Sequence, residues 1–161
     1  MALVFTSICP HPPLLLPSVG SKEDKEKVKK TIEALKILAE KIKAKEPEKI
    51  IISSPHPDWG FNVPLYFLAK NFKGEIEKHL IGLESPAFYF EKGKNFYDSE
   101  IKNSNLKIAL IASGDLSHVL KEDGPYGFHP DGPKFDKEFI VIIVCNVFIY
   151  IMRRRSFEDY V

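Results

Sequence analysis

Short uncharged runs of aliphatic and β-branched residues alternate along this chain with longer segments that are rich in charge. The runs at residues 3–9, 49–54 and 106–112 predict strands, because they are short, apolar and rich in β-forming residues. The middle run, KIIISS, is unbroken, which is typical of a strand covered on both faces in a parallel sheet. The segment IEKHLIGLE at 76–84 shows no helical period and favours a further strand.

The segment between the first two strands predicts a long amphipathic helix. Ser21 is suited to cap it, Asp24 stands three residues further on, and Pro47 ends it. Apolar residues recur in between at spacings of four and three, and Lys and Glu fill the other face; the apolar positions are Val28, Ile32, Leu35, Ala39 and Ile42. The charge-dense stretch 22–49 is therefore interpreted as a solvated helix face.

Two further helices are expected. Pro64 marks a boundary, so a short helix is predicted at 65–70, and Ser85 with Pro86 begins a second helix. The second helix is expected to bury a stripe formed by Phe88, Phe96, Tyr97 and Ile101. Alternating strands and helices predict an α/β fold, a single domain with a mostly parallel central sheet flanked by helices.

The composition narrows the functional classes. With 161 residues, of which 44% are hydrophobic and 28% charged, the chain has the size and balance of one globular domain. The 23 basic and 22 acidic residues give a net charge of +1, so no nucleic-acid partner is expected. The two cysteines, Cys9 and Cys145, cannot form a disulfide framework and lack the spacing of a metal site, which predicts a reduced, cytoplasmic protein.

The run at 139–152 is apolar and has neither helical nor alternating polarity. It is shorter than the roughly 20 residues that span a bilayer, so no membrane partner is expected. A segment without a polar face must be buried, associate with another chain or touch a membrane. A homo-oligomer is therefore the predicted state.

Each of the three apolar strands is followed by a turn and a histidine, namely His11, His56 and His118. The carboxyl ends of parallel strands form the ligand-binding edge of an open α/β sheet, so we expect these imidazoles to meet there. Neutral imidazole binds Zn, Fe, Cu or Ni, and a free imidazole exchanges protons near neutral pH. The sequence predicts a shared metal or acid/base site, although each histidine taken alone also suits a structural or surface position.

Three other residues are candidates for the lining of this site. His129 lies in a Gly/Pro-rich loop, which either wraps over a pocket or forms an exposed turn. Trp59, close to His56, is either a pocket wall or a core residue. Asp115 stands three residues before His118 and is the third candidate.

The motifs CPHPPLLLP, IISSPHPDW, ALIASGDLSH and DGPYGFHPDGPKFD resemble the catalytic LigB-type subunit of class III extradiol aromatic ring-opening dioxygenases, in particular its Memo-like branch. The resemblance covers most of residues 1–136. It implies an Fe(II) enzyme that opens a small catechol-type aromatic ring, with the metal held by two histidines and one glutamate. By matching motif, His11 and His56 are the implied metal ligands and His118 is the implied catalytic acid/base.

The chain departs from the family pattern in two places. Trp59 and Val63 are four positions apart where the family carries many more residues, so the LigB-like domain at 1–136 is expected to be shortened internally. Beyond it the family continues to the glutamate ligand, whereas an atypical apolar tail at 137–161 follows here, as a frameshifted or truncated reading frame would produce. The carboxylates that are candidates to replace the glutamate are Asp58, Asp115 and Glu138.

Two other functions stay open. The Memo-like relatives imply that this fold also serves as a non-catalytic metal- or ligand-binding protein. His11, His56 and His118 together would form a three-histidine face for Zn(II) with an open water position, as in a Zn-dependent hydrolase. Metal content and ring-cleavage assays distinguish these functions.

Overall fold

The computed structural model of the chain describes residues 2–140. The chain divides into two compact units, one ending at Asp115 and one beginning at Leu116, and each is described by itself. The first unit is an α/β structure built on a four-stranded sheet.

The sheet of the first unit is parallel throughout. Its strands are β1 (Leu3–Cys9), β2 (Lys49–Ser54), β3 (Glu75–Leu80) and β4 (Ile108–Ser113), and they lie side by side in the order β1-β4-β2-β3. The predicted α/β fold with a mostly parallel sheet is confirmed. The strands predicted at 3–9 and 49–54 have the predicted bounds.

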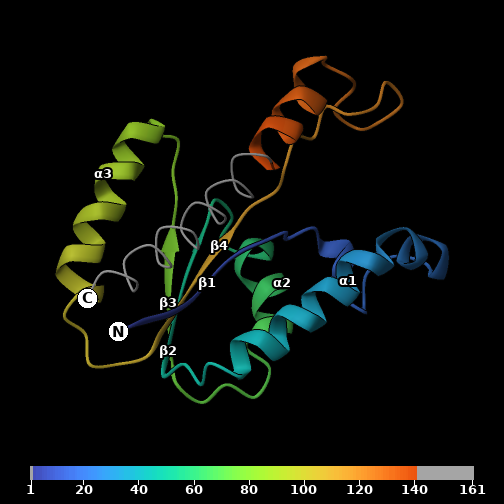
Figure 1. The fold of residues 1–161 in the computed structure, drawn as a ribbon. Coiled ribbons are helices and arrows are strands. Elements are labelled where there is room, and N and C mark those ends of the chain that lie inside the picture. The colour runs from blue at the N-terminus through green and yellow to red at the C-terminus, as the bar shows by residue number, and fades with distance from the viewer. Residues whose placement is uncertain (1, 141–161) are drawn as a thin grey trace, which may run out of the picture. The chain divides into compact units, whose positions relative to one another are not determined.

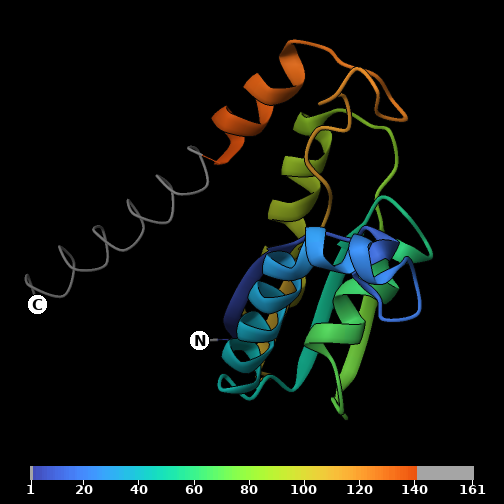
Figure 2. The same cartoon turned by 90° about the vertical axis from the view of Figure 1, so that its right-hand side faces the viewer.

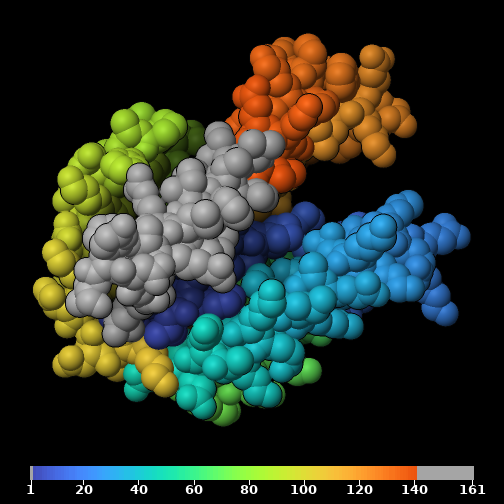
Figure 3. All heavy atoms as spheres, viewed as in Figure 1, coloured from blue at the N-terminus to red at the C-terminus, as the bar shows by residue number. Residues whose placement is uncertain are grey.

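Helices cover both faces of the sheet. α1 (Lys22–Lys43) and α2 (Trp59–Leu68) lie on one face, whereas α3 (Pro86–Phe96) and the π-helical turn η2 (Tyr97–Ile101) lie on the other (Figure 1 and Figure 2). The side chains of α1 form a ridge on the surface (Figure 3). The first unit therefore has three layers, with the sheet in the middle.

The start of α1 is confirmed in detail. The Ser21 hydroxyl accepts a hydrogen bond from the Asp24 N–H, and the Asp24 carboxylate accepts one from the Ser21 N–H, which is a complete capping box. A short 3-10 turn, η1 (Pro13–Leu15), leads from β1 towards this cap. The Lys25 ammonium group of α1 donates to the carbonyl oxygens of Leu14 and Leu16, so the first turn of α1 holds the loop that follows β1.

α2 begins six residues earlier than predicted, at Trp59, and Pro64 lies inside the helix instead of at its start. Proline lacks the N–H that would donate to the carbonyl oxygen four residues earlier, which is that of Gly60. The Ser113 hydroxyl at the end of β4 donates to this carbonyl oxygen instead. The helix therefore continues through the proline without a buried, unsatisfied carbonyl group.

The core lies on both faces of the central strands. Beneath α1 and α2, Ile50 and Ile52 of β2 pack with Ile111 of β4. On the opposite face, Ile51 of β2 packs with Ile101 of η2. The prediction that β2 is covered on both faces is confirmed.

α3 covers its face of the sheet only through its C-terminal end. The Phe96 ring contacts the His79 ring of β3, with centroids 4.9 Å apart, and Ile101 is 2% exposed. Phe88 and Tyr97 are 49% and 45% exposed, so the predicted buried stripe is wrong for these two residues. The helix itself has no buried residue, because only Phe96 at its C-terminal end and the residues that follow it pack against the sheet.

The second unit is described over residues 116–140. A loop leads to helical residues 131–140. Gly132 is buried at the start of this helix, where a Cβ atom would lie 2.8 Å from both the Ser117 hydroxyl and the Val119 carbonyl oxygen. Only glycine allows the helix to approach the loop this closely.

The predicted division into a domain at 1–136 and a tail at 137–161 stays a prediction, and the tail beyond residue 140 lies outside the described residues. Within residues 2–140, no helix is both long enough and apolar enough to cross a membrane.

Candidate functional site

Three neighbouring strands each deliver one polar residue to a common edge of the sheet. His11 follows β1 by two residues, His56 follows β2 by two, and Asp115 follows β4 by two. Cys9 at the end of β1 pairs with Ser113 at the end of β4, and β4 also pairs with β2. These are the carboxyl ends of parallel strands, where ligands bind in open α/β sheets.

The rings of His11 and His56 are in contact. Their centroids lie 5.2 Å apart and their planes meet at 88°, which is an edge-to-face arrangement. His11 is 3% exposed, whereas His56 is open to solvent. The structure thus brings together two of the three predicted histidines, one sheltered and one accessible.

The end of β4 holds His11 in place. The His11 backbone N–H donates to Asp115 Oδ1 at 3.2 Å, and His11 Nε2 lies 3.3 Å from Asp115 Oδ2. The other ring nitrogen, Nδ1, lies 2.9 Å from the Ser113 hydroxyl oxygen. Residues more than 100 positions later in the chain therefore fix both the backbone and the ring of His11.

The proline in α2 determines which nitrogen of His11 carries the proton. Because Pro64 has no N–H, the Gly60 carbonyl oxygen accepts the hydroxyl proton of Ser113. A serine hydroxyl has a single proton, so the Ser113 oxygen must accept its second hydrogen bond, and the donor is His11 Nδ1–H. The neutral His11 ring is therefore the Nδ1–H tautomer, with its lone pair on Nε2.

That lone pair lies beside the Asp115 carboxylate. Two hydrogen-bond acceptors 3.3 Å apart repel each other unless a positive charge, either a proton or a metal cation, lies close to both. The side chains of His11 and Asp115 are 4% and 20% exposed, so water screens this repulsion only in part. A proton or a cation close to both atoms would remove this repulsion.

Ser54 fixes the turn that carries His56. Its hydroxyl donates to the His56 carbonyl oxygen and accepts from the His56 N–H, both at 3.1 Å. A Cβ atom at Gly60 would lie 1.8 Å from the Ser54 hydroxyl oxygen and 3.2 Å from the Cβ of His56. Because only glycine fits there, the start of α2 packs directly against the His56 turn.

The buried polar side chains of the described residues all belong to this edge; they are His11, Ser54 and Ser113. Sequence reasoning missed the two serines. Each is the last residue of a buried strand and directly precedes a turn, and this position was the available signal. Buried hydroxyl groups need hydrogen-bond partners, and here they find them at the two histidine turns.

Cys9 lies at the same end of β1 and is fully buried. Burial raises the pKa of its thiol from 9.0 to about 11, against the smaller opposing effect of the hydrogen bond to the Ser7 hydroxyl. In the absence of a bound metal, the thiol is therefore protonated at neutral pH.

His118 and His129 belong to the second unit. The His118 ring lies 5.1 Å from the Tyr126 ring, with 34° between their planes. The His129 side chain is 62% exposed, and its backbone N–H donates to the Val119 carbonyl oxygen. The acid/base role of His118 and the lining role of His129 stay predictions.

Trp59 begins α2 and is 50% exposed, which does not fit the core position considered from the sequence. Its role as a lining residue stays a prediction. Asp115, the remaining lining candidate, contacts His11 directly.

The donor groups of this edge suit a divalent metal only in part. Imidazole nitrogens of His11 and His56 and the carboxylate of Asp115 are the ligand types of a two-histidine, one-carboxylate site. Within residues 2–140, however, no group of three or more His, Cys, Asp or Glu side chains is arranged so that it could hold a metal ion. These residues supply two adjacent imidazoles and a carboxylate beside one of them, but no complete coordination sphere.

Two comparisons with known proteins bear on this site. The sequence model of the family described as the catalytic LigB subunit of aromatic ring-opening dioxygenase matches residues 56–144, more than half of the chain. A curated protein of Clostridium acetobutylicum, Protein CA_C1420, is 28% identical over 210 aligned positions, which cover 87% of this chain and 44% of the relative. The chain thus spans less than half the length of that relative. Because 210 positions exceed the 161 residues of the chain, the clostridial protein has residues within the match that have no counterpart here.

Proposed function

Because the chain belongs to the family of the catalytic LigB subunit of aromatic ring-opening dioxygenases, we propose that it binds Fe(II) and opens a small catechol-type aromatic ring next to its diol. His11 and His56 are the proposed ligands. The proposal is carried by the contact between their rings at the carboxyl ends of β1 and β2. Zn(II) is the alternative metal, because it accepts the same imidazole donors.

Bound Fe(II) would supply open positions at which both oxygens of the diol and O2 come together. His11 offers Nε2 to the metal, since Ser113 holds the ring proton on Nδ1. Asp115 places a carboxylate oxygen 3.3 Å from the same nitrogen and so compensates positive charge there. His56 is the more accessible of the two proposed ligands.

His118 is the proposed acid/base, which accepts a proton from a catechol hydroxyl and returns it to a later intermediate. Three peptide bonds separate it from Asp115, which limits the distance between the two Cα atoms to roughly 11 Å. A neutral imidazole is suited to this role because its ordinary pKa lies close to neutral pH. Trp59 and His129 are the proposed lining residues on the substrate side.

A second candidate function is metal or ligand binding without ring cleavage, as proposed for a Memo-like protein. It is favoured by one observation, the lack of a three-ligand group within residues 2–140. A metal held by only two imidazoles would bind weakly and keep more of its charge. The two candidates share the histidine pair and differ in whether a carboxylate completes the site.

Anaerobic reconstitution with Fe(II), followed by a panel of catechols and O2, tests the first proposal. We expect bound iron and a yellow ring-opened product. The variant His56→Ala should lose the iron, whereas His118→Ala should keep the iron and lose the product. His79→Ala, on β3 against α3, is the matched control and should retain both.

Bound iron without colour from any catechol would contradict ring opening and favour the binding protein. Equal loss of iron in His56→Ala and His118→Ala would mean that His118 is a ligand. In that case retention of zinc through purification would favour the three-histidine hydrolase.

A further inference from the structure

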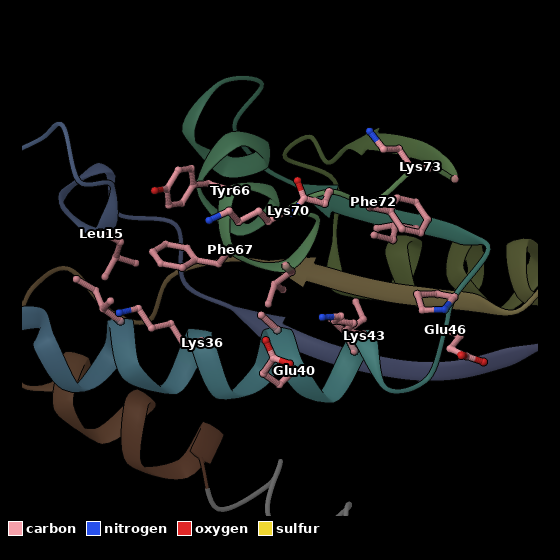
Figure 4. A pocket seen from close by; sticks show the side chains of 18 of the residues that line it. Leu15, Lys36, Glu40, Lys43, Glu46, Tyr66, Phe67, Lys70, Phe72 and Lys73 are labelled. Atoms are coloured by element: carbon pink, nitrogen blue, oxygen red, sulfur yellow. The ribbon is translucent and has the colours of Figure 1, made fainter.

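A groove of about 1290 Å³ runs along α1 on the face of the sheet that α1 and α2 cover. Figure 4 shows Lys36, Glu40 and Lys43 along α1, with Tyr66 and Phe67 of α2 across from them. The floor between the two walls includes Ile50 of β2. The groove is distinct from the edge that carries His11 and His56, since neither histidine lines it.

The dimensions of the groove fit a polypeptide segment better than a compact ligand. α1 contributes lining residues from Lys25 to Lys43, which corresponds to roughly 27 Å at 1.5 Å per residue. Pockets for drug-sized molecules measure roughly 300–1,000 Å³ and enclose most of the ligand. A groove that is longer and larger than this, with two helical walls, suits a helix or an extended strand laid along it.

Apolar side chains of the groove are left partly uncovered. Ile32, Phe67 and Phe72 pack against the main core cluster yet are only partly buried, and Tyr66 is 47% exposed. Contiguous apolar surface with a polar rim is typical of a surface that another protein segment covers. The occupant should therefore present an apolar face.

The charged side chains at the rim of the groove indicate which charge the polar face of the occupant should carry. Glu46 and Glu48 both turn to Lys107 outside the groove: Lys107 Nζ lies 3.4 Å from Glu46 Oε2, and the Lys107 N–H donates to Glu48 Oε2 at 2.8 Å. The rim also carries Lys36 and Lys43 of α1, and Lys70 and Lys73 follow α2. Glu40 also lines the groove, so five lysines, with Lys25 included, face three carboxylates there, and this positive balance favours an acidic partner.

The clostridial relative is longer than this chain. It carries residues inside the aligned region that have no counterpart in this chain. We propose that the groove between α1 and α2 is the docking site for an amphipathic, acidic peptide segment of a second polypeptide, which takes the place that an internal segment fills in the longer relative. The proposal does not depend on the chemistry at His11 and His56.

The test uses this full chain and synthetic peptides of about 20 residues that tile the unmatched internal stretches of the clostridial protein. Fluorescence anisotropy of each labelled peptide measures its affinity. We expect at least one peptide to bind saturably. The double variant Lys36→Glu/Lys43→Glu should weaken this binding by about tenfold or more, because two rim contacts become repulsive.

The matched control is Lys30→Glu/Lys41→Glu, which reverses two exposed charges on α1 outside the groove and should leave the affinity unchanged. Tyr66→Ala tests the apolar wall, and Tyr97→Ala removes an equally exposed tyrosine from the opposite side of the sheet. Circular dichroism establishes that each variant folds. No binding by any peptide at about 100 µM, or equal binding by the two double variants, overturns the proposal. It is likewise overturned if the chain alone sediments as a dimer that only the groove variant dissociates, because a second copy then fills the groove.

Discussion

Removal of the Ser113 hydroxyl tests the origin of the His11 tautomer. In the variant Ser113→Ala, the Gly60 carbonyl oxygen loses its donor, and Pro64 cannot supply another. The His11 Nδ1–H loses its acceptor in the same step. Both groups belong to buried residues, so water does not readily replace the missing partner.

The size of the effect follows from these two groups. A buried donor or acceptor left without a partner costs about 1–3 kcal/mol. Two such groups give an expected loss of roughly 2–6 kcal/mol in the free energy of unfolding, which is a large fraction of the 5–15 kcal/mol typical of a domain. Partial relaxation of the His11 ring would place the value near the lower end.

Urea denaturation followed by the fluorescence of Trp59, the single tryptophan, measures this loss. The matched control is Ser53→Ala. Ser53 is next to Ser54 in β2, and its side chain lies on the face of the strand opposite to that of Ser54. Long-range proton–nitrogen NMR of the His11 ring reports the tautomer directly. In the unaltered chain the proton should reside on Nδ1, and in Ser113→Ala the population of the Nε2–H form should rise.

A double-mutant cycle isolates the role of the proline. Pro64→Ala restores an N–H that can donate to the Gly60 carbonyl oxygen within the helix. Ser113→Ala should therefore cost less in the Pro64→Ala background than in the unaltered chain, by roughly 1 kcal/mol or more. Additive losses, an Nε2–H tautomer in the unaltered chain, or a Ser113→Ala loss no larger than that of Ser53→Ala would refute the reasoning.

Three further predictions concern other contacts of the first unit. Gly60→Ala should lower the free energy of unfolding by about 3 kcal/mol, because its Cβ would overlap the Ser54 hydroxyl; an unchanged urea midpoint would contradict this. The raised pKa of Cys9 means that the native state holds the thiol proton more tightly than the unfolded chain does, so stability is retained below about pH 9 and falls by about 2–3 kcal/mol as the pH rises to about 11. The same pH series on Cys9→Ala should lack this fall, and a shared fall would assign it to another group. The Ser21 hydroxyl and the Lys27 ammonium group lower the pKa of Asp24 to about 2. NMR titration of Ser21→Ala should therefore show this pKa shifted upward. In the unaltered chain, the contribution of the Asp24 carboxylate to the cap should be lost only as the pH falls from about 4 to about 2. An unmoved Asp24 titration would exclude the hydroxyl as the main cause.

The sequence predicted most closely those elements whose signals are local. The apolar period and the Ser21 cap define α1, and the unbroken apolar run defines β2, because these patterns depend on neighbours within a few residues. The start of α2 was mispredicted for a non-local reason. The donor that lets the helix pass through Pro64 comes from Ser113, 53 residues after Gly60.

In the candidate site, too, the local features were predictable from the sequence and the long-range contacts were not. A histidine after each strand was readable from the sequence, and the structure brings His11 and His56 into contact. The order of the strands was not readable, and it is this order that places Ser113 and Asp115 beside His11. Sequence reasoning named Asp115 only as a lining candidate and did not find Ser113 at all.

The central position of β4 has a consequence for biosynthesis. During translation, β1 and β2 emerge long before β4, yet β4 is the strand that lies between them. In a nascent chain, the strand position between β1 and β2 therefore stays unfilled until residue 113 has left the ribosome. A fragment that stops before β4 would keep both histidines in its sequence but would lack the strand that pairs with both β1 and β2.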